Sequence, residues 1–424
     1  MSGKIIGRLL LAAATCCLGA CTSVDLNQPA PVVDSVPAKP VNQVGDLQPA
    51  NAPAPSAAPA SAAPADAGTV PEAVALPVVA PEKPPVRIAL LLPAKAEGLA
   101  QVADAVRKGF MAAYQHEPGN IAVNVVETTD ASQDVLAAYR QAEQDNDIVV
   151  GPLTRSSAVS IAQSQAVTKP TIALTQVAAY GEPPVAVPAD MLPIGLSLED
   201  EAGQVADWTS RKPVNTAFVI STDVAWQRRV AGAFAAQWQA RGLKAEVMQL
   251  NMSGGYLDAN GLLDLKKRVQ QENPSLIFVA LDAAETQQLR AAIGDGVDMA
   301  GTSQVNPYTV AAWASAAPLT SMNGVQLVDM PWQLQPDQAA VMVYPRLQQD
   351  PNQPHSADIA RLYALGIDAY RVASEVAADQ TDFELDGVTG KLSVHFNLKD
   401  PARFTRVEQE AAYVNGKVQP LQTR

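Results

Sequence analysis

The sequence holds three cysteines, and all of them lie near its beginning, at Cys16, Cys17 and Cys21. Adjacent cysteines rarely reach the geometry of a disulfide. Three thiolates without a fourth ligand nearby also make a poor zinc site. The spacing therefore argues against a disulfide and against a structural metal centre, and it directs attention to the flanking residues.

Two basic residues precede an apolar run over residues 9–14, and small residues come directly before Cys21. This is the pattern of a secretory signal peptide, and the run is shorter than the about 20 residues that a membrane-spanning helix needs. The stretch Leu-Gly-Ala-Cys resembles the bacterial lipobox, which implies that residues 1–20 are removed and that Cys21 is acylated. An uncleaved anchor or soluble export is the alternative. Lipoproteins with Asp after that cysteine tend to stay at the inner membrane, and Thr22 here implies a lipid anchor in the outer membrane, facing the periplasm.

The residue types that usually perform catalysis form no recognisable pattern. His116, His355 and His395 have no HExxH motif, no neighbouring cysteine and no obvious acidic partner, so we interpret them as surface or packing residues. The sequence also lacks a GxSxG elbow, an SxxK pair and a Walker loop. We therefore predict no catalytic residue, no metal site, no cofactor and no enzymatic activity.

The stretch GPLTRSS, which begins at Gly151, follows a predicted strand at the sheet edge where open α/β folds bind ligands. The amides at the next helix start, with the hydroxyls of Ser156 and Ser157, could hold a carboxylate. Thr175 and Tyr180 are candidates to complete such an amino-acid site. The alternative is a strand-to-helix turn that is capped by its own hydroxyls.

A second candidate is the stretch DMPW, which comprises Asp329, Met330, Pro331 and Trp332. The residue before a proline is disfavoured in a helix, so we expect a break here. A tryptophan at a break either plugs a cleft between lobes or anchors a partner protein, and its large amphipathic ring suits both uses.

The composition limits the class of partner. The chain has 30 Lys and Arg against 43 Asp and Glu, a net charge of -13, without a long run of like charges. Nucleic-acid binding needs clustered basic residues, so it is not expected. Residues 23–85 are rich in Pro and Ala and poor in aromatic residues, which predicts that residues 21–85 form a lipidated cysteine followed by a disordered tether.

From residue 86 onwards, short apolar runs alternate with amphipathic stretches, which is the pattern of parallel strands and crossover helices. The runs expected to be strands are residues 86–93, 121–128, 147–152, 170–175, 191–197, 213–221, 243–250, 274–281 and 324–330. Single cores stop growing near about 250 to 300 residues, so two such series predict two lobes. The predicted fold is α/β and two-lobed, each lobe a parallel sheet flanked by helices, with lobe 1 at about 86–205 plus 335–385 and lobe 2 at about 206–330 plus 386–424.

The helix that we expect over residues 356–380 is apolar on most of its surface, which predicts burial along its length. Its remaining polar line consists of Arg361, Asp368 and Glu375, and Arg371 is placed to pair with the two acids. Because charge lines on helices usually stay in water, we interpret this line as solvated ion pairs.

At this point the residues resemble a known family. Two βα lobes are the plan of type I periplasmic binding proteins. The chain from about residue 86 onwards is similar to the C-terminal domain of the LpoA (LppC) lipoproteins in the stretches VVGPLTRSSA, GLSLEDEAGQVA, RVAGAFAAQWQARG, DMPWQL, RLYALGIDAYRV and GVTGKLSV. The resemblance implies an outer-membrane lipoprotein that activates a class A penicillin-binding protein, a peptidoglycan synthase, by protein contact.

The chain departs from this family in two places. Better-known members carry a helical repeat domain ahead of this one, whereas only the expected tether precedes residue 86. The loop PAKAEG after the first strand lacks the Ser/Thr-Gly pair usual there, which argues against contact with the carboxylate of a small-molecule ligand. Two functions stay open, a synthase activator and a solute-binding lipoprotein of an amino-acid ABC importer, and they differ in whether the cleft is occupied.

Overall fold

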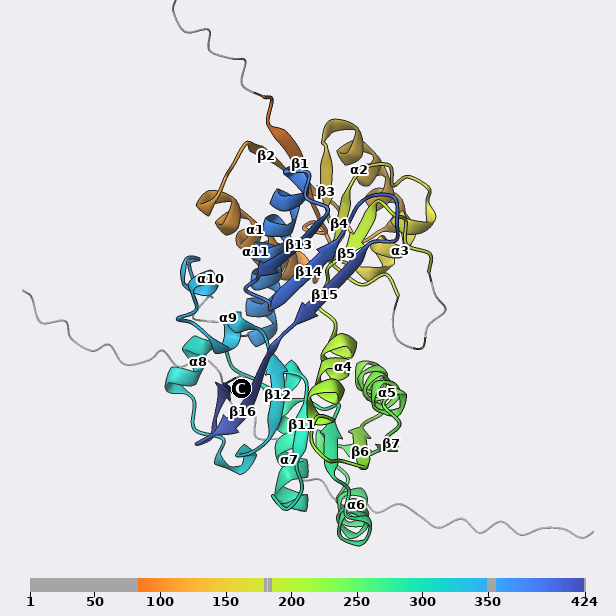
Figure 1. Ribbon diagram of the computed structural model, residues 1–424, viewed down its shortest axis with the longest axis vertical. Helices are drawn as coiled ribbons and strands as arrows, with labels where there is room; N and C mark the ends of the chain where they lie inside the picture. The colour runs from red at the N-terminus through yellow and green to blue at the C-terminus, as the bar shows by residue number, and fades with distance from the viewer. Residues whose placement is uncertain (1–82, 179–180, 182–184, 349–355, 423–424) are drawn as a thin grey trace, which may run out of the picture. The chain divides into compact units, whose positions relative to one another are not determined.

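The computed structural model describes residues 83–178, 181, 185–348 and 356–422 (Figure 1). The expected signal peptide, the lipidation site Cys21 and the tether up to residue 82 lie outside these residues. Tyr180 and His355 lie outside them as well.

The first lobe contains a five-stranded parallel sheet in the order β2-β1-β3-β4-β5. Its strands are nearly continuous apolar runs because helices cover both faces. Alternate residues of β1 pack against α1 and α11 on one face and against α2 and α3 on the other. These elements are β1 (Val86–Leu92), α1 (Ala100–His116), β2 (Ile121–Glu127), α2 (Ser132–Asp145), β3 (Ile148–Val150), α3 (Arg155–Gln163), β4 (Thr171–Ala173), β5 (Met191–Pro193) and α11 (Ala357–Ala377).

Helices α1 and α11 touch at the level of their main chains. A Cβ atom added to Gly109 would lie 1.9 Å from the carbonyl oxygen of Tyr363, and one added to Gly366 would lie 2.1 Å from that of Val106. Only glycine fits at such a crossing. These two glycines therefore fix the position of α11, on which the site described below is built.

The second lobe contains a seven-stranded sheet in the order β17-β16-β12-β11-β10-β6-β7, in which β16 alone runs antiparallel to its two neighbours, β12 and β17. Helices α4 and α5 pack on one face, and α6 and α7 pack on the other. These elements are α4 (Leu198–Thr209), β6 (Thr216–Ser221), α5 (Ala225–Ala240), β7 (Lys244–Gln249), α6 (Ala259–Glu272), β10 (Leu276–Val279), α7 (Ala283–Ile293), β11 (Met299–Gly301), β12 (Gln326–Asp329), β16 (Gln409–Val414) and β17 (Lys417–Pro420).

A third, antiparallel sheet in the order β13-β14-β15 lies against the first lobe, and Leu392 and Val394 of β14 join the same core as α1 and α11. Its strands are β13 (Asp382–Asp386), β14 (Lys391–His395) and β15 (Arg403–Val407). The remaining short elements are β8 (Met252–Ser253), β9 (Tyr256–Leu257), η1 (Ser303–Val305), α8 (Val310–Ser315), η2 (Thr320–Met322), α9 (Pro331–Leu334) and α10 (Ala339–Met342).

The two-lobed α/β fold predicted from sequence is confirmed, and all nine expected strands are present within a few residues of their predicted limits. The packing differs from the expected lobe limits at two places. Helix α4 packs on α5 in the second lobe, although residues up to 205 were expected in the first. Residues 386–407 belong to the first lobe, because the apolar side of β14 covers its helices rather than the second sheet.

Candidate functional site

Three segments join the lobes: the link from β5 to α4, the end of β12, and the junction of β15 with β16 at Glu408. The first link ends at Ser197, whose Oγ accepts a hydrogen bond from the amide of Asp200 at 3.0 Å and so caps α4. Ser197 therefore fixes where α4 begins, directly after the link between the lobes. Side chains from all three segments and from α11 meet at the lobe junction.

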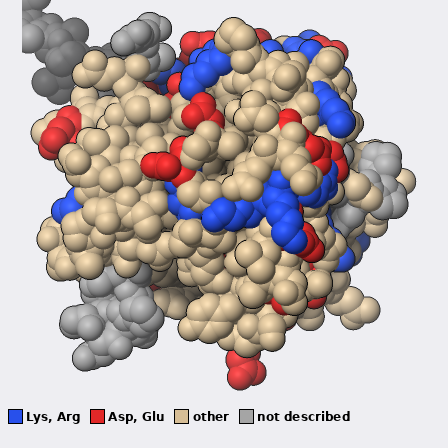
Figure 2. Space-filling model, turned by 90° about the horizontal axis from the view of Figure 1, so that it is seen from below, with Lys and Arg blue, Asp and Glu red and all other residues tan. Residues whose placement is uncertain are grey.

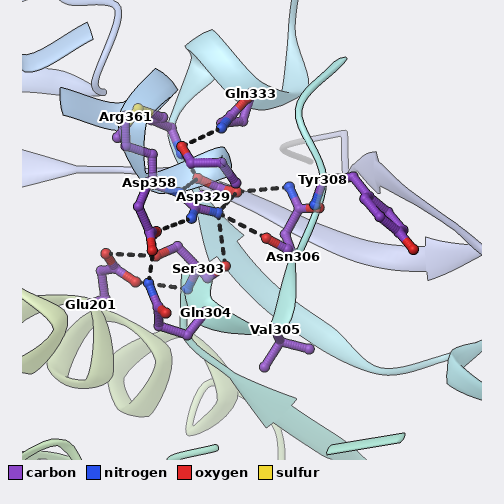
Figure 3. Close-up of polar contacts among 12 residues, drawn as sticks. Glu201, Ser303, Gln304, Val305, Asn306, Tyr308, Asp329, Gln333, Asp358 and Arg361 are labelled. Carbon is purple, nitrogen blue, oxygen red and sulfur yellow. Dashed lines mark hydrogen bonds and ion pairs between the residues drawn. The ribbon is translucent and has the colours of Figure 1, made fainter. Parts of the chain in front are cut away.

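The centre of the junction is a buried ion pair between the lobes (Figure 3). Arg361, on α11 of the first lobe, donates to both carboxylate oxygens of Asp329, at the end of β12, over 3.1 and 2.8 Å. Its Nη2 atom also donates to the carbonyl oxygens of Ser303 and Asn306, at 2.9 and 3.2 Å. The two side chains are 5% and 0% exposed. A two-pronged pair of this kind fixes geometry as well as supplying energy.

Neighbouring groups complete the hydrogen bonding of this pair. Asp329 accepts two further bonds, from the side-chain amide of Asn306 at 2.8 Å and from the amide of Met330 at 2.9 Å. The third nitrogen of Arg361 donates to Asp358 at 2.8 Å. Burial acts to lower the pKa of Arg361, but the charge of Asp329 outweighs it and holds that pKa above its ordinary value. The arginine is therefore a permanent cation at the junction.

A second acidic group lies beside the pair. Glu201, on α4, accepts hydrogen bonds from the amide of Ser303 at 2.7 Å and from its hydroxyl at 3.1 Å. Burial raises the pKa of Glu201 to about 7, and the charge of Asp329 adds to the shift. Burial, followed by the charges of Glu201 and Asp329, also raises the pKa of Glu408. The junction therefore holds two carboxyl groups whose pKa values burial raises, beside one fixed ion pair.

Two turns along α11, Asp368 makes a separate buried site within the first lobe. Its carboxylate accepts from the amides of Val388 and Thr389 at 3.0 and 2.8 Å, and from the Thr389 hydroxyl at 2.6 Å. The amide of Trp332 donates to the carbonyl of Val388 at 2.9 Å. The stretches DMPW, RLYALGIDAYRV and GVTGKLSV, which carried the family resemblance, are thus bonded to one another around α11.

An open groove of about 820 Å³ lies between the two lobes, beside the junction. A volume of this size is within the range of ligand sites in proteins. The groove is lined by Arg155, Thr175, Gln176, Ala178, Leu196, Ser197, Glu199, Asp200, Gly203, Gln204, Asp207, Ala233, Ala236, Gln237, Phe404, Thr405, Arg406 and Val407. Its walls come from both lobes and from β15, and they mix polar with small apolar side chains.

The residues predicted as a carboxylate site do not converge. Ser157 is buried and accepts from the Thr154 hydroxyl at 2.7 Å, whereas Ser156 is exposed. Gly151 has a φ of +123°, and an added Cβ would lie 2.3 Å from the carbonyl oxygen of Leu91, so close strand packing explains this glycine. Of the four described members of the predicted set, only Thr175 lines the groove.

The DMPW residues separate into two roles. Asp329 binds Arg361, as described above, while Met330 and Trp332 join the core of the first lobe. Pro331 begins helix α9, so the expected break lies just before a short helix rather than in a loop. Trp332 is 2% exposed, and the guanidinium of Arg346 lies 4.0 Å from its ring centre. The ring packs in the first lobe and does not line the groove, which favours a structural role.

The histidines need one correction. His395 was expected to lack an acidic partner, but the strand register places it opposite Asp382, and its Nδ1 contacts that carboxylate. His116 packs edge-on against Tyr344. Within the described ranges, no group of three or more His, Cys, Asp or Glu residues is arranged to hold a metal ion, and no helix is long and apolar enough to cross a membrane.

The lower end of the second lobe carries a band of Lys and Arg side chains (Figure 2). Many basic residues of the elements at this end are paired with acids. Arg268 of α6 bonds to Glu246 at 2.5 Å and to Glu272 at 2.8 Å, and Lys267 lies 3.1 Å from Asp264. Paired charges of this kind do not form the unneutralised patch that a nucleic acid needs.

Sequence reasoning missed the residues that dominate the junction. It identified Arg361, and Asp368 in the first lobe, but interpreted both as solvated, and it gave no role to Glu201 or Glu408. The one available signal was two opposite charges seven residues apart on an otherwise apolar helix. The ion pair expected between Arg371 and Asp368 is present at 3.4 Å, although Asp368 itself is buried.

Comparisons with known proteins agree with this fold. A solved structure from Chromobacterium violaceum, described as a "putative branched-chain amino acid ABC transporter", is 31% identical, covers 76% of this chain and 100% of its own, and has a TM-score of 0.59. The C-domain of LpoA from Haemophilus influenzae, described as a regulator of PBP1A, is 23% identical, covers 79% of this chain and 100% of its own, and has a TM-score of 0.63. Full-length LpoA from the same organism has 59% of its length covered.

No curated protein matches the sequence. The family model described as "LppC putative lipoprotein" matches residues 56–401, which is most of the chain, and thereby confirms the resemblance drawn from the motifs. The family and these solved structures are described as lipoproteins, regulators and transport proteins rather than as enzymes. The chain belongs to the LppC family of lipoproteins.

Proposed function

We propose that this protein is a lipoprotein, anchored in the outer membrane through Cys21 and facing the periplasm, that activates a class A penicillin-binding protein by direct contact. Membership of the LppC family supports the anchor. The shared fold with the C-domain of LpoA, a regulator of PBP1A, supports the partner. The activity requires no catalytic residue in this chain and no cofactor.

The observation that carries the proposal is the buried pair of Arg361 and Asp329. A solute receptor must open and close its lobes around a ligand. Opening here would pull Arg361 of the first lobe away from the second-lobe carbonyls of Ser303 and Asn306 and disturb its pair with Asp329, and breaking a buried pair costs about 3–5 kcal/mol. Lobes fixed in this way suit a domain that presents a constant surface to a protein partner.

The loop after β1 also argues for a protein partner. The loop lacks the Ser/Thr-Gly pair that could contact the carboxylate of a small ligand. Here the amides of Ala94, Lys95 and Ala96 donate to main-chain carbonyls at 2.9, 2.9 and 3.1 Å. These amides are already used, so they are not available to a carboxylate.

The direct test is activation in solution. Residues 86–424 should raise the glycan-polymerising or crosslinking rate of the class A synthase from the same cell, at a higher concentration than the anchored protein needs, because tethering raises local concentration. A heat-unfolded sample is the control. If the purified domain neither binds nor accelerates any class A synthase from that cell, the proposal fails.

The anchor has its own test. Cys21→Ala should block lipid attachment and leave precursor or soluble protein, whereas Cys17→Ala should label normally because residue 17 leaves with the signal peptide. Incorporation of radiolabelled palmitate measures both variants. Label that still enters the Cys21→Ala protein would contradict the assigned site.

A solute-binding lipoprotein of an amino-acid ABC importer is the second candidate. It is favoured by the 31% identical structure described as an amino-acid transporter and by the open groove of about 820 Å³. Titration calorimetry against each free amino acid decides between the two functions. We expect no tight binding, and micromolar affinity for any of them would favour the importer.

A further inference from the structure

The groove has an incomplete β-sheet as one wall. Strand β15 pairs with β14 on one side, and it has no strand partner on the other side in the described part of the chain. Phe404, Thr405, Arg406 and Val407 of β15 all line the groove. An unpaired strand edge is a ready template for another extended segment. We infer that the groove binds an extended peptide segment of the partner synthase, which adds to β15 as a fourth strand; this rests on the proposed function.

The direction of the free main-chain groups follows from two contacts. Glu408, next to β15, donates its amide to the Oε1 atom of Gln204 at 2.9 Å and accepts from Nε2 of the same side chain at 2.7 Å, so its main chain points towards α4. The carbonyl of Val407 points the other way, because an added Cβ on Gly390 would lie 2.6 Å from it. Main-chain groups alternate along a strand, so those of Phe404 and Arg406 point towards the groove.

The outward N–H and C=O groups of Phe404 and Arg406 point away from β14. They make no main-chain hydrogen bond with another described residue. Glu408 shows which group fits this edge. The carboxamide of Gln204 meets it with one donor and one acceptor, as the main chain of a paired strand would. A peptide backbone placed beside β15 would pair in the same way with the N–H and C=O groups of Arg406 and Phe404.

The side chains of the groove specify the kind of segment. Val407 is 55% exposed at its edge, and the small residues Ala233 and Ala236 of α5 leave room opposite. Glu199 and Asp207 are neutralised by Arg229 and Arg241, but Asp200 makes no ion pair among the described residues. Arg406, which also lines the groove, acts on Asp200 as a nearby positive charge, so the walls favour no single sign of charge. The groove therefore favours an extended segment with an apolar residue beside Val407. Proline-rich tethers fit poorly, because proline cannot donate to a ladder.

A substitution that fills the groove tests the inference on the full chain. Ala236→Trp places a large ring in the groove from an exposed helix position, and Ala240→Trp places the same ring at an exposed position of the same helix outside the lining. We expect Ala236→Trp to weaken binding to the class A synthase about tenfold or more, with an unchanged thermal midpoint, and Ala240→Trp to bind like the unmodified chain. Equal binding by both variants overturns the inference.

Amide hydrogen exchange supplies a second, direct readout. On binding, the amides of Phe404 and Arg406 should slow about tenfold or more, whereas those of Thr405 and Val407, already in the β14 ladder, should change little. Unchanged exchange at both outward amides overturns the inference even if the synthase binds.

If these amides are protected in the free chain and become exposed when residues 22–82 are deleted, the tether is the occupant and the inference is wrong. If the unmodified chain binds no class A synthase, the proposed function itself fails.

Discussion

Helix α11 carries two buried charges with different roles in the fold, one between the lobes and one within the first lobe. Arg361 extends from the first lobe into the second, where it meets the carboxylate of Asp329 and two carbonyls. Asp368, two turns later, stays within the first lobe, where two amides and one hydroxyl of the turn between β13 and β14 hold it and Arg371 of the same helix pairs with it. A charge satisfied entirely within its own lobe positions a hairpin. A charge satisfied by an opposite charge across the junction fixes the two lobes relative to each other.

Removing the cross-lobe cation should have the largest effect. Arg361→Met leaves Asp329 buried without its counter-ion, so the free energy of unfolding should fall by about 3–5 kcal/mol in urea titrations. Replacing both partners, as Arg361→Met with Asp329→Leu, should recover much of this loss. Lys108→Met, at an exposed ion pair on α1, is the control and should cost less than about 1 kcal/mol. A loss that small for Arg361→Met would refute the role assigned to the pair.

Neutralising Asp368 should cost less and act more locally. Asp368→Asn keeps the shape but turns an NH2 group towards a donor, which should lower the free energy of unfolding by about 1–3 kcal/mol. Hydrogen exchange should speed up in β13 to β15 and stay unchanged in β10 to β12. Faster exchange in both lobes alike would mean that the two charges of α11 do not act separately.

The sequence predicted the strands and long helices well because each is a local pattern of apolar residues. The same reasoning misjudged Arg361, because nothing local tells whether a polar residue on an apolar helix meets water or a partner 32 positions away, as Asp329 is. The limits of the lobes were misplaced for a related reason. Whether β14 covers the first lobe or extends the second sheet depends on tertiary packing and not on its own alternation of residues.

The candidate site was predicted less completely than the fold. Ser156, Ser157 and Gly151 were selected because their types suit a carboxylate site, but the structure uses Gly151 for close packing and bonds Ser157 to Thr154. The groove, by contrast, is lined by a mixture of charged, amide, hydroxyl and small apolar side chains that come from distant parts of the sequence. These residues form no motif along the chain, so only their arrangement in the fold reveals them.

The acid beside the cross-lobe pair makes that junction sensitive to pH. The pKa of Glu201 is about 7 in the folded protein, above its ordinary value of 4.5, so the folded state holds this proton more tightly than the unfolded state. Its contribution to stability is therefore full below about pH 4.5, falls as pH rises to about 7, and is flat above that. The fall should be about 1–3 kcal/mol.

Glu201→Gln should remove this part of the pH dependence. Urea titrations at pH 5 and pH 8 should show a smaller difference for the variant than for the unmodified protein, while Glu272→Gln, at an exposed ion pair on α6, should show the same difference as the unmodified protein. An identical pH dependence for Glu201→Gln would show that the proton is not held at this residue. The stability of the junction would then depend on the ion pair of Arg361 and Asp329 and not on a proton at Glu201.

The smallest change in stability is expected at the exposed ion pair between Asp382 and His395, which joins β13 to β14. Hydrogen bonding to His395 lowers the pKa of Asp382, yet the Asp382 side chain is 66% exposed. Water competes for such a pair and salt screens it, so it adds little to stability. Asp382→Asn should leave the urea midpoint unchanged, whereas Asp368→Asn shifts it. A comparable shift for both variants would mean that the outer pair, and not the buried carboxylate under the turn, holds the hairpin on α11.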